Sequence, residues 1–238
     1  ITNIKAKKSR NHTELILKNF NYPINIKKNK KYDLIKIRGL SQFNSFNYNV
    51  PGDISSAAFF IALTILSNDS NLLIKDVNIN PSRTGIIKIL KKMNAIIKIS
   101  NRRTYKGEIT GDIYIESSNN LKSINCDPKY NSEAIDEFIL IFLIAAKANG
   151  ISKFKNLGEL NKKESPRLDL SIKFLKMIGI KVYRNQDNIK IFGNPNLKLN
   201  NIYHIKNFLK DHRIFMMSII AALTLGGTWT VDDKDSIK

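Results

Sequence analysis

The chain has 238 residues and a mass of 27.2 kDa, which is enough for one large domain or two ordinary ones. Its one cysteine, Cys126, excludes a disulfide framework and a cysteine-built zinc site, and no apolar run reaches the roughly 18 residues that a membrane-spanning helix needs. The 39 Lys and Arg against 20 Asp and Glu give a net charge of +19, which is typical of proteins that bind nucleic acid, anionic membranes or small anionic substrates.

The positive charge comes mainly from lysine. There are 31 Lys against 8 Arg, spread along the whole chain together with 38 Ile and 29 Asn. Proteins that read nucleic acid tend to cluster their charge and to use Arg, whose planar guanidinium can bind two acceptors at once. We therefore interpret the excess charge mainly as the codon bias of an AT-rich genome, and a nucleic-acid-binding module stays open as an alternative.

The hydrophobic pattern predicts helices and strands along most of the chain. Apolar residues three and four positions apart predict amphipathic helices, and Ile-x-Ile or Ile-x-Val alternation predicts strands. In chain order the predicted elements are a helix after Ser9-Arg10 with strands at 24–26 and 34–38, an apolar helix at 53–66 with a strand at 71–77, a helix after Ser82-Arg83 with strands at 96–99 and 112–116, an apolar helix within 136–150 with a strand at 151–157, a helix after Ser165-Pro166-Arg167 with strands at 180–182 and 188–192, and an apolar helix within 211–227 with a strand at 228–231.

Three of these helices share one design. Each starts at an Asp, runs through apolar and small residues, and ends at a polar residue or Gly. The starting residues are Asp53, Asp136 and Asp211, with spacings of 83 and 75 residues. Asp is favoured at helix N-caps, so we expect each of the three carboxylates to lie at the first turn of a buried helix.

The remaining predicted helices share a second design. They follow Ser9, Ser82 and Ser165, which we expect to be helix N-caps. Pro166 suits a first helical turn, and Gly179 suits a helix C-terminus.

Together the two designs form a repeat of helix, strand, helix, strand and strand, about 75–85 residues long by the Asp spacings. In this frame the first copy lacks its first helix, and the last copy stops where its second helix should begin. We therefore expect the chain to be a piece of a longer reading frame, cut inside a repeat at both ends.

Five motifs carry further information, because they occur in a fixed order within this repeat frame. They are Val50-Pro-Gly-Asp-Ile-Ser-Ser-Ala-Ala-Phe59, Asn80-Pro-Ser-Arg-Thr-Gly85, Ile135-Asp-Glu-Phe138, Glu159-Leu-Asn-Lys-Lys-Glu-Ser-Pro-Arg167 and Asp211-His-Arg-Ile214. Each motif alone is weak. Together they resemble the EPSP synthase family, the 3-phosphoshikimate 1-carboxyvinyltransferases of the shikimate pathway, over nearly the whole chain but only a little over half of a typical member.

The resemblance implies an α/β fold built from repeated βαβαββ units. The family has two domains of three units each, an inverse α/β barrel arrangement with the active site in the cleft between the domains. On this reading residues 1–46 are the last part of a domain formed mainly by a missing N-terminal half. Residues 47–238 form most of the second domain, without its C-terminal end.

The implied reaction transfers the enolpyruvyl group of phosphoenolpyruvate to the 5-hydroxyl of shikimate 3-phosphate and releases phosphate. Both substrates are polyanions, so the site needs cations to hold them and acid–base groups to move two protons. The resemblance implies no metal and no cofactor. We expect the isolated chain to be inactive, because the family's other substrate-binding residues lie upstream.

The resemblance assigns acceptor binding and proton transfer to four residues. Asp136 acts on the acceptor hydroxyl as base or orienting group, Lys163 contacts shikimate 3-phosphate, and Glu164 moves a proton at the phosphoenolpyruvate carbons. Lys163 is included among the catalytic residues, and Ser9 binds the phosphate of shikimate 3-phosphate. The plainer reading of these side chains is helix capping and surface ion pairs.

The donor, phosphoenolpyruvate, is assigned to Arg167, Arg213 and Lys238 by the same resemblance. Arg suits this role because its planar fork binds carboxylate or phosphate at two points. Lys163 and Arg167 are four residues apart, so one helical turn can aim both side chains in the same direction.

Three other readings stay open. UDP-N-acetylglucosamine enolpyruvyl transferase shares the fold and the donor, a basic nucleic-acid-binding module fits the charge, and a catalytically dead repeat scaffold fits the repeats. The family reading implies small anionic substrates as the partners, no nucleic acid or membrane partner, a monomer at full length, and a cytoplasmic location.

Overall fold

The computed structural model describes residues 1–42, 45, 47–206, 208–209 and 211–232. Its elements in chain order are β1 (Thr2–Lys7), α1 (His12–Asn19), β2 (Ile24–Lys28), β3 (Tyr32–Ile37), α2 (Ile54–Leu66), β4 (Asn71–Asn78), α3 (Gly85–Lys92), β5 (Ile97–Tyr105), β6 (Glu108–Glu116), α4 (Phe138–Lys147), β7 (Gly150–Phe154), α5 (Arg167–Met177), β8 (Val182–Asn185), β9 (Asn188–Gly193), β10 (Leu199–Ile205), α6 (His212–Leu225) and β11 (Gly226–Val231), with short 3-10 turns at Pro128–Tyr130 and Gly158–Lys162.

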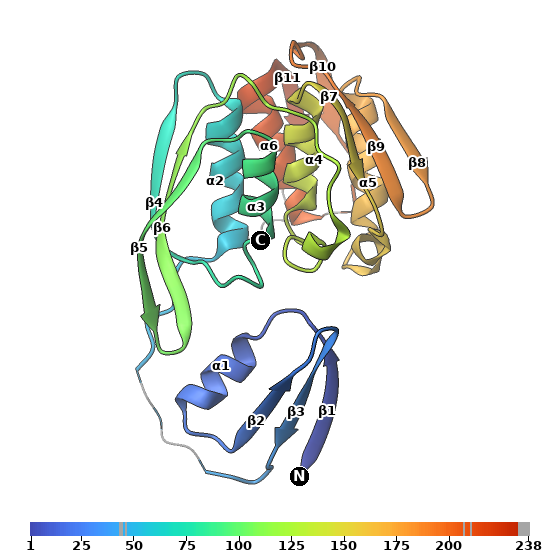
Figure 1. Ribbon diagram of the computed structural model, residues 1–238. Helices are drawn as coiled ribbons and strands as arrows, with labels where there is room; N and C mark the ends of the chain where they lie inside the picture. The colour runs from blue at the N-terminus through green and yellow to red at the C-terminus, as the bar shows by residue number, and fades with distance from the viewer. Residues whose placement is uncertain (43–44, 46, 207, 210, 233–238) are drawn as a thin grey trace.

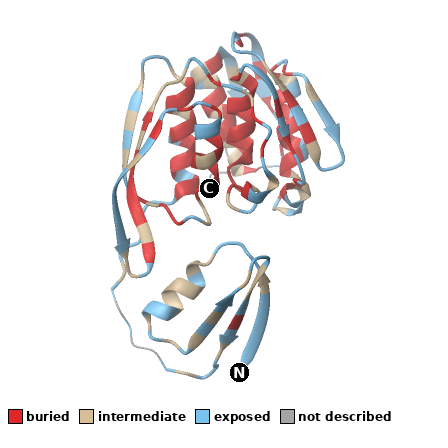
Figure 2. Cartoon of the chain, in the orientation of Figure 1, coloured by how far each residue is buried: buried red, intermediate tan, exposed pale blue. Residues whose placement is uncertain are grey.

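The first four elements form a small N-terminal unit (Figure 1). Its antiparallel sheet has the order β1-β3-β2, and α1 lies beside it. Little of this unit is buried, because α1 contains no buried residue and Ile4 and Leu34 of the sheet are exposed (Figure 2). Polar contacts join it to the rest of the chain: His12 Nδ1 lies 2.5 Å from Glu108 Oε1, and Asn80 Nδ2 donates to Asn11 Oδ1 at 2.9 Å.

The larger part of the chain packs around the central helices α2, α4 and α6, which all contact one another. The sheets β4-β6-β5, β7-β9-β8 and β10-β11 lie outside them, and α3 and α5 contact the central helices from the side. Every residue of α4 from Phe138 to Ala146 is buried, as Figure 2 shows by colour. A helix that is apolar all round is stable only in the middle of a core, so the sequence itself places α4 there.

The predicted repeat is confirmed. The series α2-β4-α3-β5-β6 is followed by α4-β7-α5-β8-β9, and then by α6-β11. Each central helix also joins two parallel strands or bridges: Gly52 pairs with Val77 around α2, Lys122 with Asn149 around α4, and β10 with β11 around α6. The unit is therefore βαβαββ, as expected. Two strands, β1 and β10, were not predicted.

Three helix starts differ from the sequence prediction. Ser9, Ser82 and Ser165 are not N-caps, because α1, α3 and α5 begin two or three residues after them. Ser82 hydrogen-bonds the side chain of Asn80, and Ser165 donates to Asp211 across the chain, so these hydroxyls serve other contacts.

The expectation that each central helix starts at an Asp is confirmed for two of the three helices. Asp53 accepts from the Ser56 amide at 3.1 Å and caps α2, and Asp211 caps α6 through the amides of Arg213 and Ile214. The third expectation is wrong, since α4 begins at Phe138 and Asp136 lies in the turn before it.

The one cysteine of the chain, Cys126, is free and buried. Burial raises the pKa of the Cys126 thiol to about 11, which keeps it protonated and unreactive at neutral pH.

The longest helix in the described part of the chain, α6, has 14 residues, and none of the described helices is long and apolar enough to cross a bilayer.

Candidate active site

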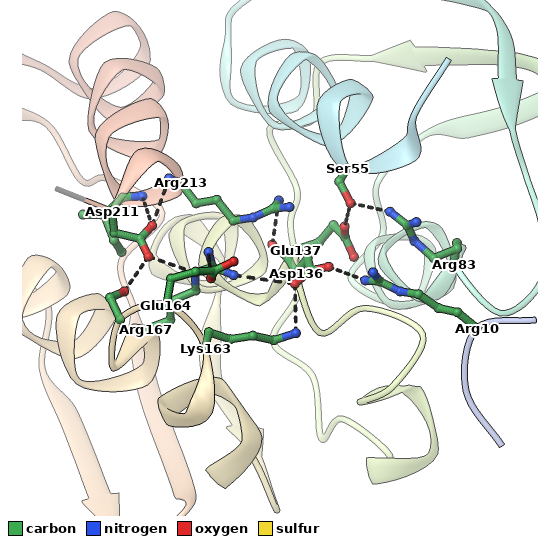
Figure 3. A network of polar contacts seen from close by, with 12 residues as sticks. Arg10, Ser55, Arg83, Asp136, Glu137, Lys163, Glu164, Arg167, Asp211 and Arg213 are labelled. Carbon is green, nitrogen blue, oxygen red and sulfur yellow. Dashed lines mark hydrogen bonds and ion pairs between the residues drawn. The ribbon is translucent and has the colours of Figure 1, made fainter. Parts of the chain in front are cut away.

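The first turns of α2, α4 and α6 meet at one end of the helix bundle (Figure 3). Ser55 of α2 donates its hydroxyl to the carboxylate of Glu137, at the start of α4. Arg213 of α6 donates through Nη1 to the backbone carbonyl of Asp136 at 3.3 Å. Because helix N-termini present free N–H groups and the positive end of the helix dipole, their meeting point favours anions.

Asp136 lies at the centre of this meeting point. Its side chain is 9% exposed and is paired with the Arg10 guanidinium. Lys163 Nζ lies 3.3 Å and Arg167 Nη1 3.6 Å from its Oδ1. Burial acts to raise the pKa of Asp136, but the hydrogen bond and charge of Arg10, with the charges of Arg213 and Lys163, outweigh it and lower the pKa to about 2. The carboxylate is therefore ionised at neutral pH.

Arg167 contacts three carboxylates although its side chain is only 2% exposed. Its Nε donates to Asp211 Oδ2 at 2.9 Å, its Nη2 to Glu164 Oε2 at 2.6 Å, and its Nη1 faces Asp136. Three surrounding carboxylates compensate for the cost of burying one guanidinium. Anionic groups are thus the partners that this arginine is built to hold.

Lys163, Glu164 and Arg213 form the accessible side of the site. The side chain of Glu164 is 73% exposed and that of Lys163 is 25% exposed. Arg213 is half-buried, and its Nε makes no hydrogen bond with the described residues. These groups can therefore change partners when an anion arrives.

Glu137 lies beside Asp136 but in a separate network. Its side chain is buried, and Oε2 has no hydrogen-bond partner among the described residues. Burial, together with the nearby charge of Asp136, raises the pKa of Glu137 in spite of the Ser55 hydrogen bond. Arg83 donates to Ser55 at 2.7 Å and to Asp53 at 2.9 Å, so this network ties the segment before α3 to the first turn of α2.

The structure brings together most of the residues that the sequence predicted for the site. They are Asp136, Lys163, Glu164, Arg167 and Arg213.

Two predicted residues lie apart from this group, and two others were missed. Ser9 is exposed and adjoins Arg10 in the chain, and Lys238 lies outside the described residues. Arg10 and the paired role of Asp211 were not predicted. A signal for Arg10 existed, because it occupies the same repeat position as Arg83 and Arg167.

An apolar groove of about 450 Å³ lies between α2 and α6 and has Arg213 among its lining residues. Phe60, Met216 and Leu223 are among its lining residues. An apolar lining does not suit a polyanion, so the charged cluster around Asp136 is the better candidate for chemistry on anionic molecules.

Comparison with known proteins decides the family. The protein-family model described as EPSP synthase (3-phosphoshikimate 1-carboxyvinyltransferase) matches residues 1–238 of this chain. The chain belongs to the EPSP synthase family. A relative in Thermodesulfovibrio yellowstonii, named 3-phosphoshikimate 1-carboxyvinyltransferase, is 38% identical over 231 residues, which cover 97% of this chain and 52% of the relative. The chain thus spans about half the length of the curated relatives that it matches.

Two solved structures agree with the fold of this chain. The 2.37 Å structure of EPSP synthase from Acinetobacter baumannii superimposes with a TM-score of 0.87 at 32% identity, covering 99% of this chain and 53% of that one. The enolpyruvyl transferase NikO from Streptomyces tendae superimposes with a TM-score of 0.67 at 14% identity, covering 99% and 52% of the two chains, which is evidence for the fold alone. The predicted α/β fold of an enolpyruvyl transferase is therefore confirmed.

Proposed function

We propose that the protein to which this chain belongs transfers the enolpyruvyl group of phosphoenolpyruvate to the 5-hydroxyl of shikimate 3-phosphate. The observation that carries the proposal is the cluster at the helix N-termini. In the described part of the chain, the buried carboxylate of Asp136 faces three cations, Arg10, Lys163 and Arg167. A fourth cation, Arg213, donates to the backbone carbonyl of the same residue. Several cations around one ionised carboxylate fit the binding of two polyanions next to an acid–base group.

The cations divide between the two substrates. Arg167 and Arg213 hold phosphoenolpyruvate, with Lys238 as a further contact outside the described residues. Lys163, together with Ser9, holds shikimate 3-phosphate. Substrate anions would take over contacts that Asp136 and Glu164 make with these cations. Since those cations lower the pKa of Asp136, losing part of them raises its basicity at the moment when a base is needed.

Two carboxylates move the protons. As the 5-hydroxyl oxygen bonds to C2 of phosphoenolpyruvate, the hydroxyl proton passes to Asp136, and C3 gains a proton from the carboxyl group of Glu164. The resulting adduct then loses the C3 proton to Glu164 as the C2–O bond to phosphate breaks, which restores the double bond and releases phosphate. Glu164 suits this shuttle because its exposed side chain can follow the substrate while Arg167 holds one oxygen.

The proposed reaction also implies how the chain divides into domains and which partners it binds. Residues 1–46 end one domain and residues 47–238 form most of the other, so the substrates lie between them. The contact of Arg10, from the N-terminal unit, with Asp136 supports a site that needs both parts. The partners are then small anions rather than nucleic acid, the protein acts as a monomer, and its phosphorylated substrates place it in the cytoplasm.

Phosphate release from phosphoenolpyruvate tests the proposal. The assay uses the protein at full family length, that is, this chain together with the part of the family that it does not span, with shikimate 3-phosphate or UDP-N-acetylglucosamine as acceptor. We expect release only with shikimate 3-phosphate, and no turnover by residues 1–238 alone. Release only with the nucleotide sugar would move the protein to the related transferase, and no release with either would overturn the proposal.

A further inference from the structure

One carboxylate, that of Asp211, contacts the side chain of Arg167 and the backbone of Arg213, the two arginines that we assign to phosphoenolpyruvate. The side chain of Asp211 is 1% exposed. Its Oδ2 accepts from Arg167 Nε at 2.9 Å and from the Ser165 hydroxyl at 2.5 Å. Its Oδ1 accepts from the backbone amides of Arg213 at 2.9 Å and Ile214 at 3.1 Å. Each oxygen of this buried group thus serves a different segment of the chain.

The contact with Arg167 is directional. Asp211 occupies Nε, on one side of the guanidinium, and this leaves Nη1 and Nη2 facing Asp136 and Glu164 in the site. A guanidinium held at Nε keeps its plane fixed while its Nη groups can exchange one anionic partner for another. Asp211 is therefore arranged to orient Arg167 from behind.

The contact with α6 is also directional. Capping by Asp211 fixes the first turn of the helix, where Arg213 is the second residue. Burial acts to raise the pKa of Asp211, but the hydrogen bonds of Ser165 and Arg167 and the charge of Arg167 outweigh it and lower the pKa. The carboxylate that contacts Arg167 and the start of α6 is therefore ionised at neutral pH.

We propose that Asp211 is a positioning residue that fixes Arg167 and Arg213 relative to each other and so shapes the phosphoenolpyruvate site without touching the substrate. This inference rests on the proposed function, because it concerns the donor half of that site. It predicts that the loss of the carboxylate weakens donor binding and spares acceptor binding.

The chain offers a matched control in Asp53. This residue also caps a central helix, α2, and also pairs with an arginine, since Arg83 Nη2 lies 2.9 Å from its Oδ1. Asp53 makes neither of the arginine contacts just described. Asp53→Asn therefore removes a cap carboxylate and the partner of Arg83 without removing a contact of Arg167 or Arg213.

The first experiment needs no catalytic activity. In 15N-labelled residues 1–238, we expect the Arg167 Nε–H proton to exchange slowly with solvent, because it is buried and donates to Asp211. Asp211→Asn keeps a side chain that can cap a helix but removes the charged acceptor. We expect at least tenfold faster exchange in Asp211→Asn and no such change in Asp53→Asn. Unchanged protection of Arg167 in Asp211→Asn would overturn the proposal.

The second experiment measures kinetics in the protein at full family length. For Asp211→Asn we expect the KM for phosphoenolpyruvate to rise at least tenfold and the KM for shikimate 3-phosphate to change less than threefold. Asp53→Asn should change neither KM by more than threefold. Equal rises in both KM values, or the same pattern in Asp53→Asn, would show that Asp211 supports only the fold.

The two experiments test the proposed function and the positioning role of Asp211 separately. If the unmodified protein does not turn over with shikimate 3-phosphate, the proposed function fails, while the exchange of the Arg167 proton still decides whether Asp211 orients Arg167. If Asp211→Asn does not fold, Asp211→Ser takes its place, because Ser can cap α6 but is too short to reach Arg167. The same two outcomes then apply.

Discussion

Removal of the carboxylate of Asp136 should make the stability of the chain less dependent on pH. Asp136 has its pKa lowered from 3.8 to about 2 by Arg10, Arg213 and Lys163, against the effect of burial. A carboxyl group whose pKa is lower in the folded state stabilises that state above its unfolded pKa. This stabilisation is lost as pH falls through the folded pKa. At about 1.4 kcal/mol per pH unit, Asp136 contributes at most about 2.4 kcal/mol at pH 7.

The same linkage gives the size of the effect at low pH. The contribution falls to about 1.3 kcal/mol at pH 3 and about 0.4 kcal/mol at pH 2. The difference in unfolding free energy between the unmodified chain and Asp136→Asn should therefore shrink by about 1 kcal/mol between pH 7 and pH 3. Carboxyl groups far from the site titrate in both proteins, so their effects cancel in this difference.

Urea unfolding followed by circular dichroism, at pH 7, 5, 4 and 3, measures the effect. The matched experiment repeats the substitution in an Arg10→Met background. There the pH dependence of the difference should be smaller, because the main partner of Asp136 is absent. A difference that stays constant from pH 7 to pH 3, or that is unaffected by Arg10→Met, would refute the ion pairs assigned to Asp136.

Two other substitutions test the site and the fold. Arg213→Ala, in the protein at full family length, should raise the KM for phosphoenolpyruvate far more than that for shikimate 3-phosphate, and equal effects on both would contradict its assignment to the donor. Gly193→Ala should destabilise the chain by about 3 kcal/mol in urea unfolding, because a Cβ there would lie 2.0 Å from the Ala148 carbonyl oxygen. Gly39→Ala is the control, since a Cβ there would meet nothing within 4 Å, and equal losses in both variants would rule out the clash as the cause.

The fold could be predicted where hydrophobic pattern and repeat agreed. The run from Phe138 to Ala146 is apolar on every side, which indicates a helix at the centre of a core, and the structure buries all of it. Strands β1 and β10 were missed for a physical reason. Thr2–Lys7 carries Lys and Asn among few apolar residues and buries none of them, so pairing with β3 makes it a strand. In Leu199–Ile205 the buried residues Leu199, Tyr203 and Ile205 are interrupted by two Asn residues and by a register shift between Leu199 and Ile202, which breaks the alternation that predicts a strand.

The candidate site could be predicted only in part. The motifs identified Asp136, Lys163, Glu164 and Arg167, which are close together in the fold. They could not show that Arg10, more than a hundred residues away in the chain, is an ion-pair partner of Asp136. Such a contact depends on how the N-terminal unit meets the rest of the chain, and local pattern does not contain that information.

The repeat explains how one arrangement yields both framework and site. Each central helix has an Asp near its start, and each Asp pairs with an Arg from the second helix design. The pairs are Asp53–Arg83, Asp136–Arg10 and Asp211–Arg167. The three pairs differ in what else the carboxylate does.

The start of α4 makes the difference at Asp136. Asp53 and Asp211 each use an oxygen to cap their helices, so those carboxylates are partly committed to the backbone. Because α4 begins two residues after Asp136, that side chain caps no helix in the described part of the chain, and its oxygens face Arg10, Lys163 and Arg167. A delay of the helix by two residues thus leaves one carboxylate of a repeated set available for the acid–base role that we propose for Asp136, while Asp211 stays bound to Arg167 and to the start of α6.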